Sequence, residues 1–223
     1  MSINVAIDGP AGAGKSTIAK ALASDLGFIY VDTGAMYRAM ALYVVENEIP
    51  DEDEEAVAKA CPDIDIRIAF EDGVQCVYLN GENVNGRIRT EQISSMSSKI
   101  SAQPAVRAHL LELQRSLAHS ADVIMDGRDI GTNVLPDAQV KIFLTASVEV
   151  RAQRRYKEYL EKGQPAVLEE IEQDIKERDY RDMHREIAPL KQAKDAVLVD
   201  TSDMNIQQVV ACIKEIIKEK TEK

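Results

Sequence analysis

The stretch Gly9-Pro10-Ala11-Gly12-Ala13-Gly14-Lys15-Ser16-Thr17 lies between an apolar run, residues 3–7, and a helical pattern, residues 18–26. It fits G-x-x-x-x-G-K-[ST] in the order strand, loop, helix, which argues against a chance glycine turn. In such a loop the backbone N–H groups and the helix N-terminus surround a polyphosphate, a lysine reaches the outer phosphates, and a hydroxyl binds Mg²⁺. The stretch therefore predicts that residues 9–17 bind nucleotide phosphates, with Lys15 on the phosphates and Ser16 on the metal.

Length and charge restrict the class of protein. The chain has 223 residues, of which 45% are hydrophobic, and this is enough for one core with a small inserted lobe. A net charge of −11 argues against a nucleic acid polymer as the main partner, although a local arginine cluster can still attract small anions. No apolar run reaches the ~18 residues of a membrane span and no signal-peptide pattern is visible. We expect a cytoplasmic protein that binds no membrane.

The apolar segments predict an α/β fold. A helix over residues 18–26, ending at Gly27, separates the first strand from a second at residues 28–31, which indicates a right-handed βαβ unit in a parallel sheet. Ligands bind such sheets at the carboxyl ends of the strands. Further core strands and flanking helices are expected at these residues: strands 122–126, 140–144 and 196–199, and helices 35–47 and 206–218.

An insertion is expected between roughly Thr33 and Arg107. Apolar residues alternate from Ile64, and the turn dipeptides Asp72-Gly73 and Asn80-Gly81 follow, so residues 64–84 predict a small antiparallel sheet. Such a sheet interrupts the alternation of strands and helices, as an inserted lobe does. Around it we expect a helix opened by the acidic run 51–55 with Asp51 as its cap, and helices that begin at Thr90 and Pro104.

Arginines concentrate between the fourth and fifth core strands. Residues 151–165, which we place between helices, contain Arg151, Arg154 and Arg155 and end near Gly163 and Pro165. The segment is expected to be a mobile lid, and one of its arginines would reach the phosphates only when it closes.

A second group of arginines follows on a helix expected at residues 167–184. Arg178, Arg181, Asp182 and Arg185 fall on one helical stripe. The stripe is either a salt-bridged surface, which the neighbouring acids favour, or a cationic site that neutralises phosphates during phosphoryl transfer.

Five motifs together resemble the bacterial cytidylate kinase family, over essentially the whole chain. They are GPAGAGKST at 9–17, DTGAMYR at 32–38, DGRDIGT at 126–132, KERD at 176–179 and residues 185–190. The second and third are more specific than the phosphate-binding loop, which would name only a superfamily. The resemblance implies a P-loop kinase that uses ATP and Mg²⁺ to convert CMP and dCMP to their diphosphates in pyrimidine metabolism, as a monomer. It implies a core of residues 1–32 and 108–223, with the lid at about 151–165, and a nucleoside-monophosphate-binding lobe of residues 33–107.

The resemblance also implies roles for individual residues. Thr33 and Arg38 would contact the acceptor nucleotide, and Asp182 its sugar. Cytosine would be recognised by Ser98, Arg107, Arg128 and Asp129, although Asp129 could instead contact the sugar. The phosphates would be held by Arg178 and Arg185, and the expected catalytic group is Lys15, Arg155, Arg178 and Arg185. Whether Ser16 or Thr17 contacts the metal stays open.

Two other interpretations are kept for comparison. One is a kinase of the same fold for UMP, AMP or shikimate, against which the DGRDIGT loop and the hairpin insertion speak. The other is a slow P-loop switch, and the sequence contains no guanine-reading N-K-x-D. The hydrogen-bonding groups of the base also favour cytosine. Its N4 amino donor suits a carboxylate, and its N3 and O2 acceptors suit arginine or serine donors. Uracil has an O4 acceptor and an N3–H donor at the first two of these positions, so two of the hydrogen bonds are lost.

Overall fold

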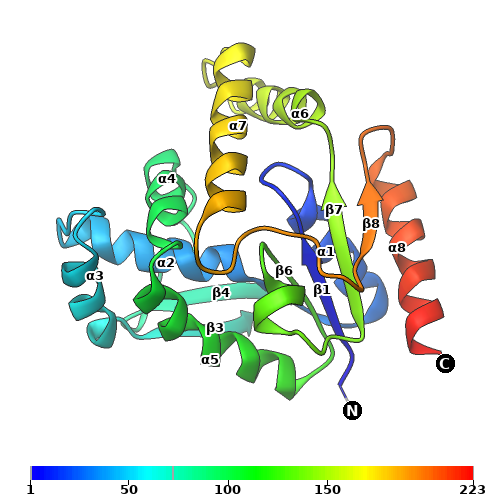
Figure 1. Cartoon of the computed structure of the whole chain (residues 1–223), viewed down its shortest axis with the longest axis horizontal. Coiled ribbons are helices and arrows are strands. Elements are labelled where there is room, and N and C mark those ends of the chain that lie inside the picture. The colour runs from blue at the N-terminus through cyan, green and yellow to red at the C-terminus, as the bar shows by residue number, and fades with distance from the viewer. Residues whose placement is uncertain (1, 72, 223) are drawn as a thin grey trace.

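The computed structural model describes residues 2–71 and 73–222. Its centre is a parallel sheet with strand order β2-β6-β1-β7-β8, which confirms the expected five-stranded core (Figure 1). The strands are β1 Asn4–Asp8, β2 Ile29–Asp32, β6 Val123–Gly127, β7 Val140–Thr145 and β8 Val197–Asp200. Strand β1 pairs with β6 on one side and β7 on the other, so the phosphate-binding loop leaves from the middle of the sheet.

Helices cover both faces of this sheet. On one face α1 (Lys15–Leu26) and α8 (Ile206–Thr221) contribute Leu22 and Ile213 to a core with Ile142. On the other face α2 (Thr33–Glu46) and α5 (Pro104–Ser120) pack around Met125. The two cores explain why β1 is fully buried at its centre, since its side chains alternate between the faces. Among the described residues no helix is both long enough and apolar enough to cross a membrane.

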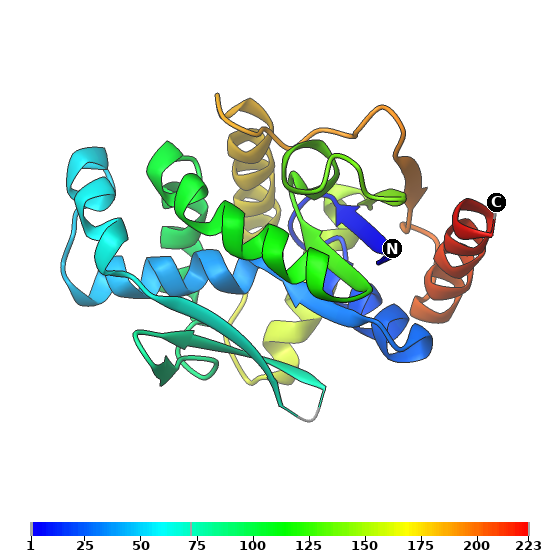
Figure 2. The same ribbon diagram turned by 90° about the horizontal axis from the view of Figure 1, so that it is seen from below.

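The predicted antiparallel sheet is present. It has the order β3-β4-β5, with β3 Ile66–Glu71, β4 Val74–Leu79 and β5 Glu82–Asn83. Asn80 and Gly81 have φ values of 49° and 87°, as the predicted hairpin turn requires. Asp72, the first residue of the other predicted turn, lies outside the described residues. Figure 2 shows this small sheet beneath α2, apart from the parallel sheet. The division into residues 33–107 and the remainder stays a prediction.

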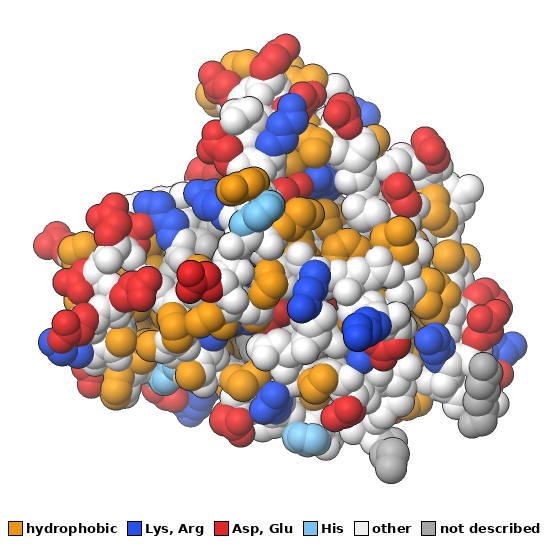
Figure 3. All heavy atoms as spheres, viewed as in Figure 1, with side chains coloured by type: hydrophobic (Ala, Val, Ile, Leu, Met, Phe, Trp, Pro, Cys, Tyr) orange, Lys and Arg blue, Asp and Glu red, His pale blue; other side chains and the backbone are white. Residues whose placement is uncertain are grey.

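The acidic run opens a helix, but with a different cap. Helix α3 spans Glu54–Ala60, and the side chain of Asp53 accepts the N–H of Ala56. The prediction that Asp51 caps this helix is therefore wrong, because Asp51 instead pairs with Lys99 at 2.8 Å. Figure 3 shows acidic side chains gathered over this end of the molecule.

Helix α4 spans Glu91–Ile100 with Thr90 as its cap, and Pro104 is the first residue of α5, both as expected. The short helices η1 and η2 span Cys61–Asp63 and Ile130–Val134.

The arginine-rich segment is mostly helical, which the sequence interpretation missed. Helix α6 covers Val148–Glu161, and α7 covers Leu168–His184. The two helices pack as a hairpin around Ala152, Ile171 and Ile175, and Figure 1 shows them projecting beyond the sheet above the phosphate-binding loop. Residues 151–161 therefore belong to a helix instead of lying between two helices. That they move as a lid stays a prediction.

Candidate active site

The phosphate-binding loop leaves β1 in a conformation that only glycine can adopt. Gly9 has φ 151°, and a Cβ there would lie 1.9 Å from the carbonyl oxygen of Leu144. Gly12 and Gly14 have φ values of 76° and 89°, and α1 begins at Lys15. Free N–H groups of the helix N-terminus therefore face the loop, which creates a site for an anion.

Lys15 is a buried cation in this loop. Its side chain is buried, and Nζ donates to the carbonyl oxygen of Pro10 at 2.8 Å. Burial, and then the nearby Arg128 guanidinium, lower the pKa of Lys15 to about 7. An anion beside Nζ would reverse this effect, because opposite charge favours the ammonium form.

A hydroxyl and a carboxylate meet beside Lys15. The Ser16 hydroxyl donates to Asp126 at 2.9 Å, and the Tyr30 hydroxyl donates to the other oxygen of the same carboxylate at 3.0 Å. Burial, followed by the carboxylate of Asp32, raises the pKa of Asp126 to about 6. The sequence interpretation left Asp126 out of the predicted site residues, although its position at the end of a strand beside β1 was a usable signal.

One cleft of about 520 Å³ extends from the phosphate-binding loop toward α4, α5 and α7. Sixteen of the predicted residues line it: Ala11, Gly12, Gly14, Lys15, Ser16, Thr17, Thr33, Arg38, Ser98, Arg107, Arg128, Asp129, Arg155, Arg178, Asp182 and Arg185. Gly9, Pro10 and Ala13 do not line this cleft. The cleft brings together side chains from residues 11 to 185, which no local pattern could show.

Thr33 and Arg38 lie where β2 passes into α2. The Thr33 hydroxyl donates to the carbonyl oxygen of Asp126 at 2.7 Å, and Arg38 donates to the Asp32 carboxylate at 3.0 Å. Asp32 also caps α2. Its own N–H and C=O are both bound by the side-chain amide of Gln75, at 2.9 and 3.2 Å. The small sheet is thereby tied to the edge of the parallel sheet beside Arg38.

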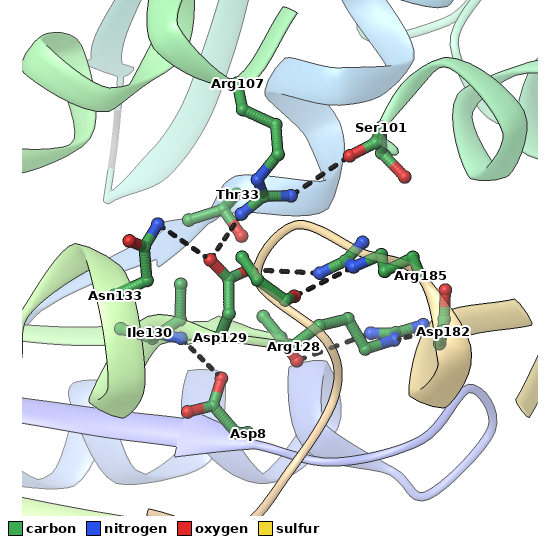
Figure 4. A network of polar contacts seen from close by, with 12 residues as sticks. Asp8, Thr33, Ser101, Arg107, Arg128, Asp129, Ile130, Asn133, Asp182 and Arg185 are labelled. Atoms are coloured by element: carbon green, nitrogen blue, oxygen red, sulfur yellow. Dashed lines mark hydrogen bonds and ion pairs between the residues drawn. The ribbon is translucent and has the colours of Figure 1, made fainter. Parts of the chain in front are cut away.

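A buried ionic network closes the far end of the cleft (Figure 4). The Asp129 carboxylate accepts from Arg107, from Asn133 at 3.2 Å and from Arg185 at 3.4 Å. Arg107 also donates to the carbonyl oxygen of Ser101 at 3.1 Å and lies over the ring of Tyr37, 5.6 Å from its centre. These residues form a rigid group of donors and acceptors around Asp129.

A second ion pair lies between this network and the phosphate-binding loop. Arg128 donates to Asp182 at 2.8 Å. Burial opposes ionisation of Asp182, but Arg128 outweighs it and the pKa of Asp182 is lowered.

The hydroxyl of Ser98, which also lines the cleft, is buried without a hydrogen-bond partner in the described part of the chain. Buried polar atoms are rarely left unpaired, so this hydroxyl fits contact with a ligand.

The arginine stripe divides into two environments. Arg178, Asp182 and Arg185 line the cleft, whereas Arg181 is exposed outside it. Within the described ranges, Arg178 has no carboxylate partner within ion-pair distance, and its Nε is buried and unpaired. Burial, and then Arg128, lower the pKa of Arg178 to about 10. The salt-bridged surface interpretation is therefore wrong for Arg178, and the inclusion of Arg181 in the cationic site is also wrong.

The three arginines of α6 already have protein partners. Arg151 donates to Ala146 and Ala11 carbonyl oxygens and to Asp179, at 2.9, 3.0 and 2.6 Å. It therefore holds the phosphate-binding loop at Ala11, and both Arg151 and Arg154 also line the cleft. Arg154 donates to Thr201. Arg155 lines the cleft while its guanidinium contacts Tyr159 and Glu91. Which of them reaches a transferred phosphate stays a prediction.

A second cavity, of about 640 Å³, opens on the other side of the phosphate-binding loop. It is lined by Ala13, Gly14, Thr17 and Ile18, by Arg154, and by residues 201, 204–207 and 209 of the segment after β8. The sequence interpretation missed it, although residues 201–205 directly follow a core strand at the ligand-binding edge.

A parallel sheet of this order, a phosphate-binding loop after its central strand and a cationic cleft beside that loop define a P-loop kinase, a phosphotransferase. Comparison with known proteins then narrows the class. The family model described as cytidylate kinase matches residues 5–219, and the chain belongs to this family.

Named relatives agree with this assignment, and a solved structure agrees with the fold. A cytidylate kinase of Lactobacillus gasseri is 53% identical, covering 98% of this chain and 95% of its own. One from Carboxydothermus hydrogenoformans is 49% identical, covering 99% of each chain. The solved shikimate kinase from Acinetobacter baumannii, in complex with shikimate, is 16% identical with a TM-score of 0.51, covering 100% of this chain and 97% of its own. At that identity it supports the fold alone.

Proposed function

We propose that the protein transfers the γ-phosphoryl group of ATP to CMP and dCMP, giving CDP and dCDP, as a cytoplasmic monomer. The observation that carries the proposal is the single cleft in which the phosphate-binding loop faces the unpaired Arg178 and, beyond it, the Asp129 network. Family membership supports the same reaction and speaks against the shikimate, UMP and AMP alternatives and against a slow switch.

ATP would bind across the phosphate-binding loop. Its triphosphate would meet Lys15 and the N-terminus of α1, and its base would enter the second cavity beside Arg154 and residues 201–205. The cavity shares Gly14, Thr17 and Arg154 with the main cleft, so the two lie next to each other, and we place the triphosphate where they meet. This arrangement directs the γ-phosphate toward the arginines of α7.

The low pKa of Lys15 predicts that ATP binding weakens as pH rises. Below about pH 7 Lys15 is already protonated in the free enzyme. Above about pH 7 Lys15 is mostly neutral in the free enzyme, so it must take up a proton when the triphosphate binds. We expect the Kd for ATP to rise by about tenfold per pH unit between about pH 7 and pH 9. Calorimetric titration at each pH measures it. Lys15→Arg should give a flat profile, because a guanidinium stays charged over this range. A flat profile in the unsubstituted enzyme would contradict the prediction.

The residues beside Lys15 fit Mg²⁺. This ion prefers oxygen ligands and usually takes only one or two from protein, the rest being water and substrate phosphate. Ser16 and Asp126 supply a hydroxyl and a carboxylate 2.9 Å apart, and they would hold the ion directly or through water. When bound, the metal would neutralise charge on the donor phosphates. Among the described residues no three His, Cys, Asp or Glu side chains gather as a metal site, as suits an ion held largely by its substrate.

The acceptor would lie with its base at the Asp129 network and its phosphate near Arg38, Arg178 and Arg185. Ser98, Arg107 and Arg128 would supply donors to the cytosine ring, and Asp129 or Asp182 would accept from its amino group or its sugar. Because the acceptor phosphate is already anionic at pH 7, no protein base is needed. The chain contributes positioning and charge neutralisation.

A substrate panel tests this function. We expect purified enzyme with ATP and Mg²⁺ to phosphorylate CMP and dCMP with kcat/KM at least about tenfold higher than for UMP, AMP or GMP, because uracil leaves buried partners unpaired at about 1 to 3 kcal/mol each. A coupled assay for ADP measures the rates. Equal rates across the panel would refute the proposed base recognition, and acceptor-independent GTP hydrolysis would favour a switch.

A further inference from the structure

Asp8 is a buried carboxylate that has no part in the proposed reaction. It is the last residue of β1, immediately before Gly9, and its side chain is buried. Its two oxygens accept different backbone N–H groups, each at 2.8 Å. Oδ1 accepts from Ile130 (Figure 4), and Oδ2 accepts from Gly131. The contact joins positions 122 and 123 residues apart in the chain.

These two N–H groups directly follow Asp129. A carboxylate that binds two successive peptides fixes the direction in which the chain leaves the preceding residue, here Asp129. The side chain of Asp129 bonds to Arg107 and Arg185, which both line the cleft. Asp129 thus bonds to side chains around the proposed acceptor site. Asp8 belongs to the central strand β1 and connects that strand to the segment that carries Asp129.

A carboxylate suits this position better than an amide does. Both loop groups are donors, and only a carboxylate offers two acceptor oxygens, since an amide would turn an NH₂ toward one of the N–H groups. Burial also raises the pKa of Asp8 to about 6, so the ionised side chain is held here at a cost in free energy. A contact that served packing alone would be met more cheaply by an uncharged side chain.

The strand that carries Asp8 also starts the phosphate-binding loop. Gly9 is confined against the carbonyl oxygen of Leu144, so the chain has little freedom between Asp8 and the loop. The backbone of Asp8 continues into the phosphate-binding loop at the donor site. The side chain of Asp8 binds the N–H groups of Ile130 and Gly131, next to Asp129 at the acceptor site. The two halves of the active site therefore share one fixed point.

We propose that Asp8 is a positioning residue for acceptor recognition, holding residues 129–131 so that Asp129 meets the base of the acceptor in fixed relation to the phosphate-binding loop. The inference rests on the proposed function. Asp8 acts through Asp129 and touches neither substrate.

Asp8→Asn tests the proposal with almost no change in shape. We expect the KM for CMP to rise about tenfold, the equivalent of one lost hydrogen bond, while kcat and the KM for ATP stay within about twofold. The preference for CMP over UMP in kcat/KM should fall by a similar factor, because only CMP uses the oriented carboxylate. Asp25→Asn is the matched control, since it removes a carboxylate from an exposed ion pair with Lys214. It should leave all these constants unchanged.

A double substitution separates positioning from a general structural role. If Asp8 acts through Asp129, Asp8→Asn combined with Asp129→Asn should have the same KM for CMP as Asp129→Asn alone. Multiplying effects would overturn the proposal, as would an unchanged KM and preference in the single variant. Should Asp8→Asn not fold, Asp8→Glu tests the same contact, because it keeps both acceptor oxygens and the charge but displaces them by one methylene from the N–H groups of Ile130 and Gly131. The same two outcomes then support or overturn the inference.

Activity of the unsubstituted enzyme shows whether the proposed function or only the proposed role of Asp8 has failed. If it does not phosphorylate CMP, the proposed function fails. If it does, and the variants keep their KM for CMP and their preference, only the role of Asp8 fails.

Discussion

Lys15→Ala is expected to lower kcat for CMP phosphorylation by roughly 10²–10³-fold, the typical cost of removing one preorganised group that stabilises a transition-state charge. The ammonium is buried at the base of the phosphate-binding loop, where water is excluded and its charge is little screened. The KM for CMP should change far less, because the acceptor end of the cleft is left intact. Initial rates from a coupled ADP assay at saturating substrates measure the effect.

The same substitution should leave the fold intact. Lys15 has a lowered pKa, so the folded protein disfavours its charged form at pH 7 and alanine removes that cost. The unfolding temperature of Lys15→Ala should therefore not fall below that of the unsubstituted enzyme by more than a few degrees. Lys218→Ala, which removes an exposed lysine of α8, is the control for loss of positive charge. Normal turnover by Lys15→Ala would refute the assigned role.

Arg178→Ala should lower kcat by roughly 10²-fold or more. Its guanidinium enters the cleft without a carboxylate partner in the described part of the chain, so its charge is available to a phosphate. Removing it also relieves repulsion from Arg128, the second cause of its lowered pKa. We therefore expect activity to fall without loss of stability. Rapid-quench or steady-state rates, with thermal unfolding alongside, measure both quantities.

Arg181→Ala provides a closely matched control. It removes the same side chain three residues along the same helix, but Arg181 is exposed and outside the cleft. We expect unchanged kcat and KM from this variant. Equal losses at the two positions would show that the charge of α7 as a whole matters, and would contradict a specific phosphate contact by Arg178.

The backbone pattern of the fold was largely predictable because its signals are local. The core strands, the helix that ends at Gly27 and the hairpin at Asn80-Gly81 all follow from periodicity and turn chemistry over a few residues. The errors concern one helix cap and one helix. Asp51 and Asp53 are equally good caps by type, and the choice depended on Lys99, which lies 48 residues away and pairs with Asp51. Helix α6 was missed because its polar, arginine-rich sequence has only a narrow apolar stripe.

For the site, the motifs named most of the residues but not their relations. DTGAMYR and DGRDIGT pointed to Thr33, Arg38, Arg128 and Asp129, and the cleft contains all four. Their roles as substrate contacts stay predictions. Asp126 and Asp8 were not among the predicted site residues. The end of a core strand was a signal for Asp126, but its bond to Ser16, 110 residues away, could not be seen in the sequence, and neither could the bond between Asp8 and Ile130, 122 residues apart.

The sequence by itself determined the class of chemistry, because a phosphate-binding loop is a continuous segment whose glycines, lysine and hydroxyl act on one ligand together. Only the tertiary structure decided which arginines are free to meet a phosphate. Arg151 is bound to Ala11 and Asp179, and Arg181 is exposed to solvent. Arg178 is half-buried, and among the described residues its buried Nε has no hydrogen-bond partner. All three are the same residue type in similar helical surroundings. What separates them is the distance to carboxylates and to water, and that is set by packing between segments far apart in the chain.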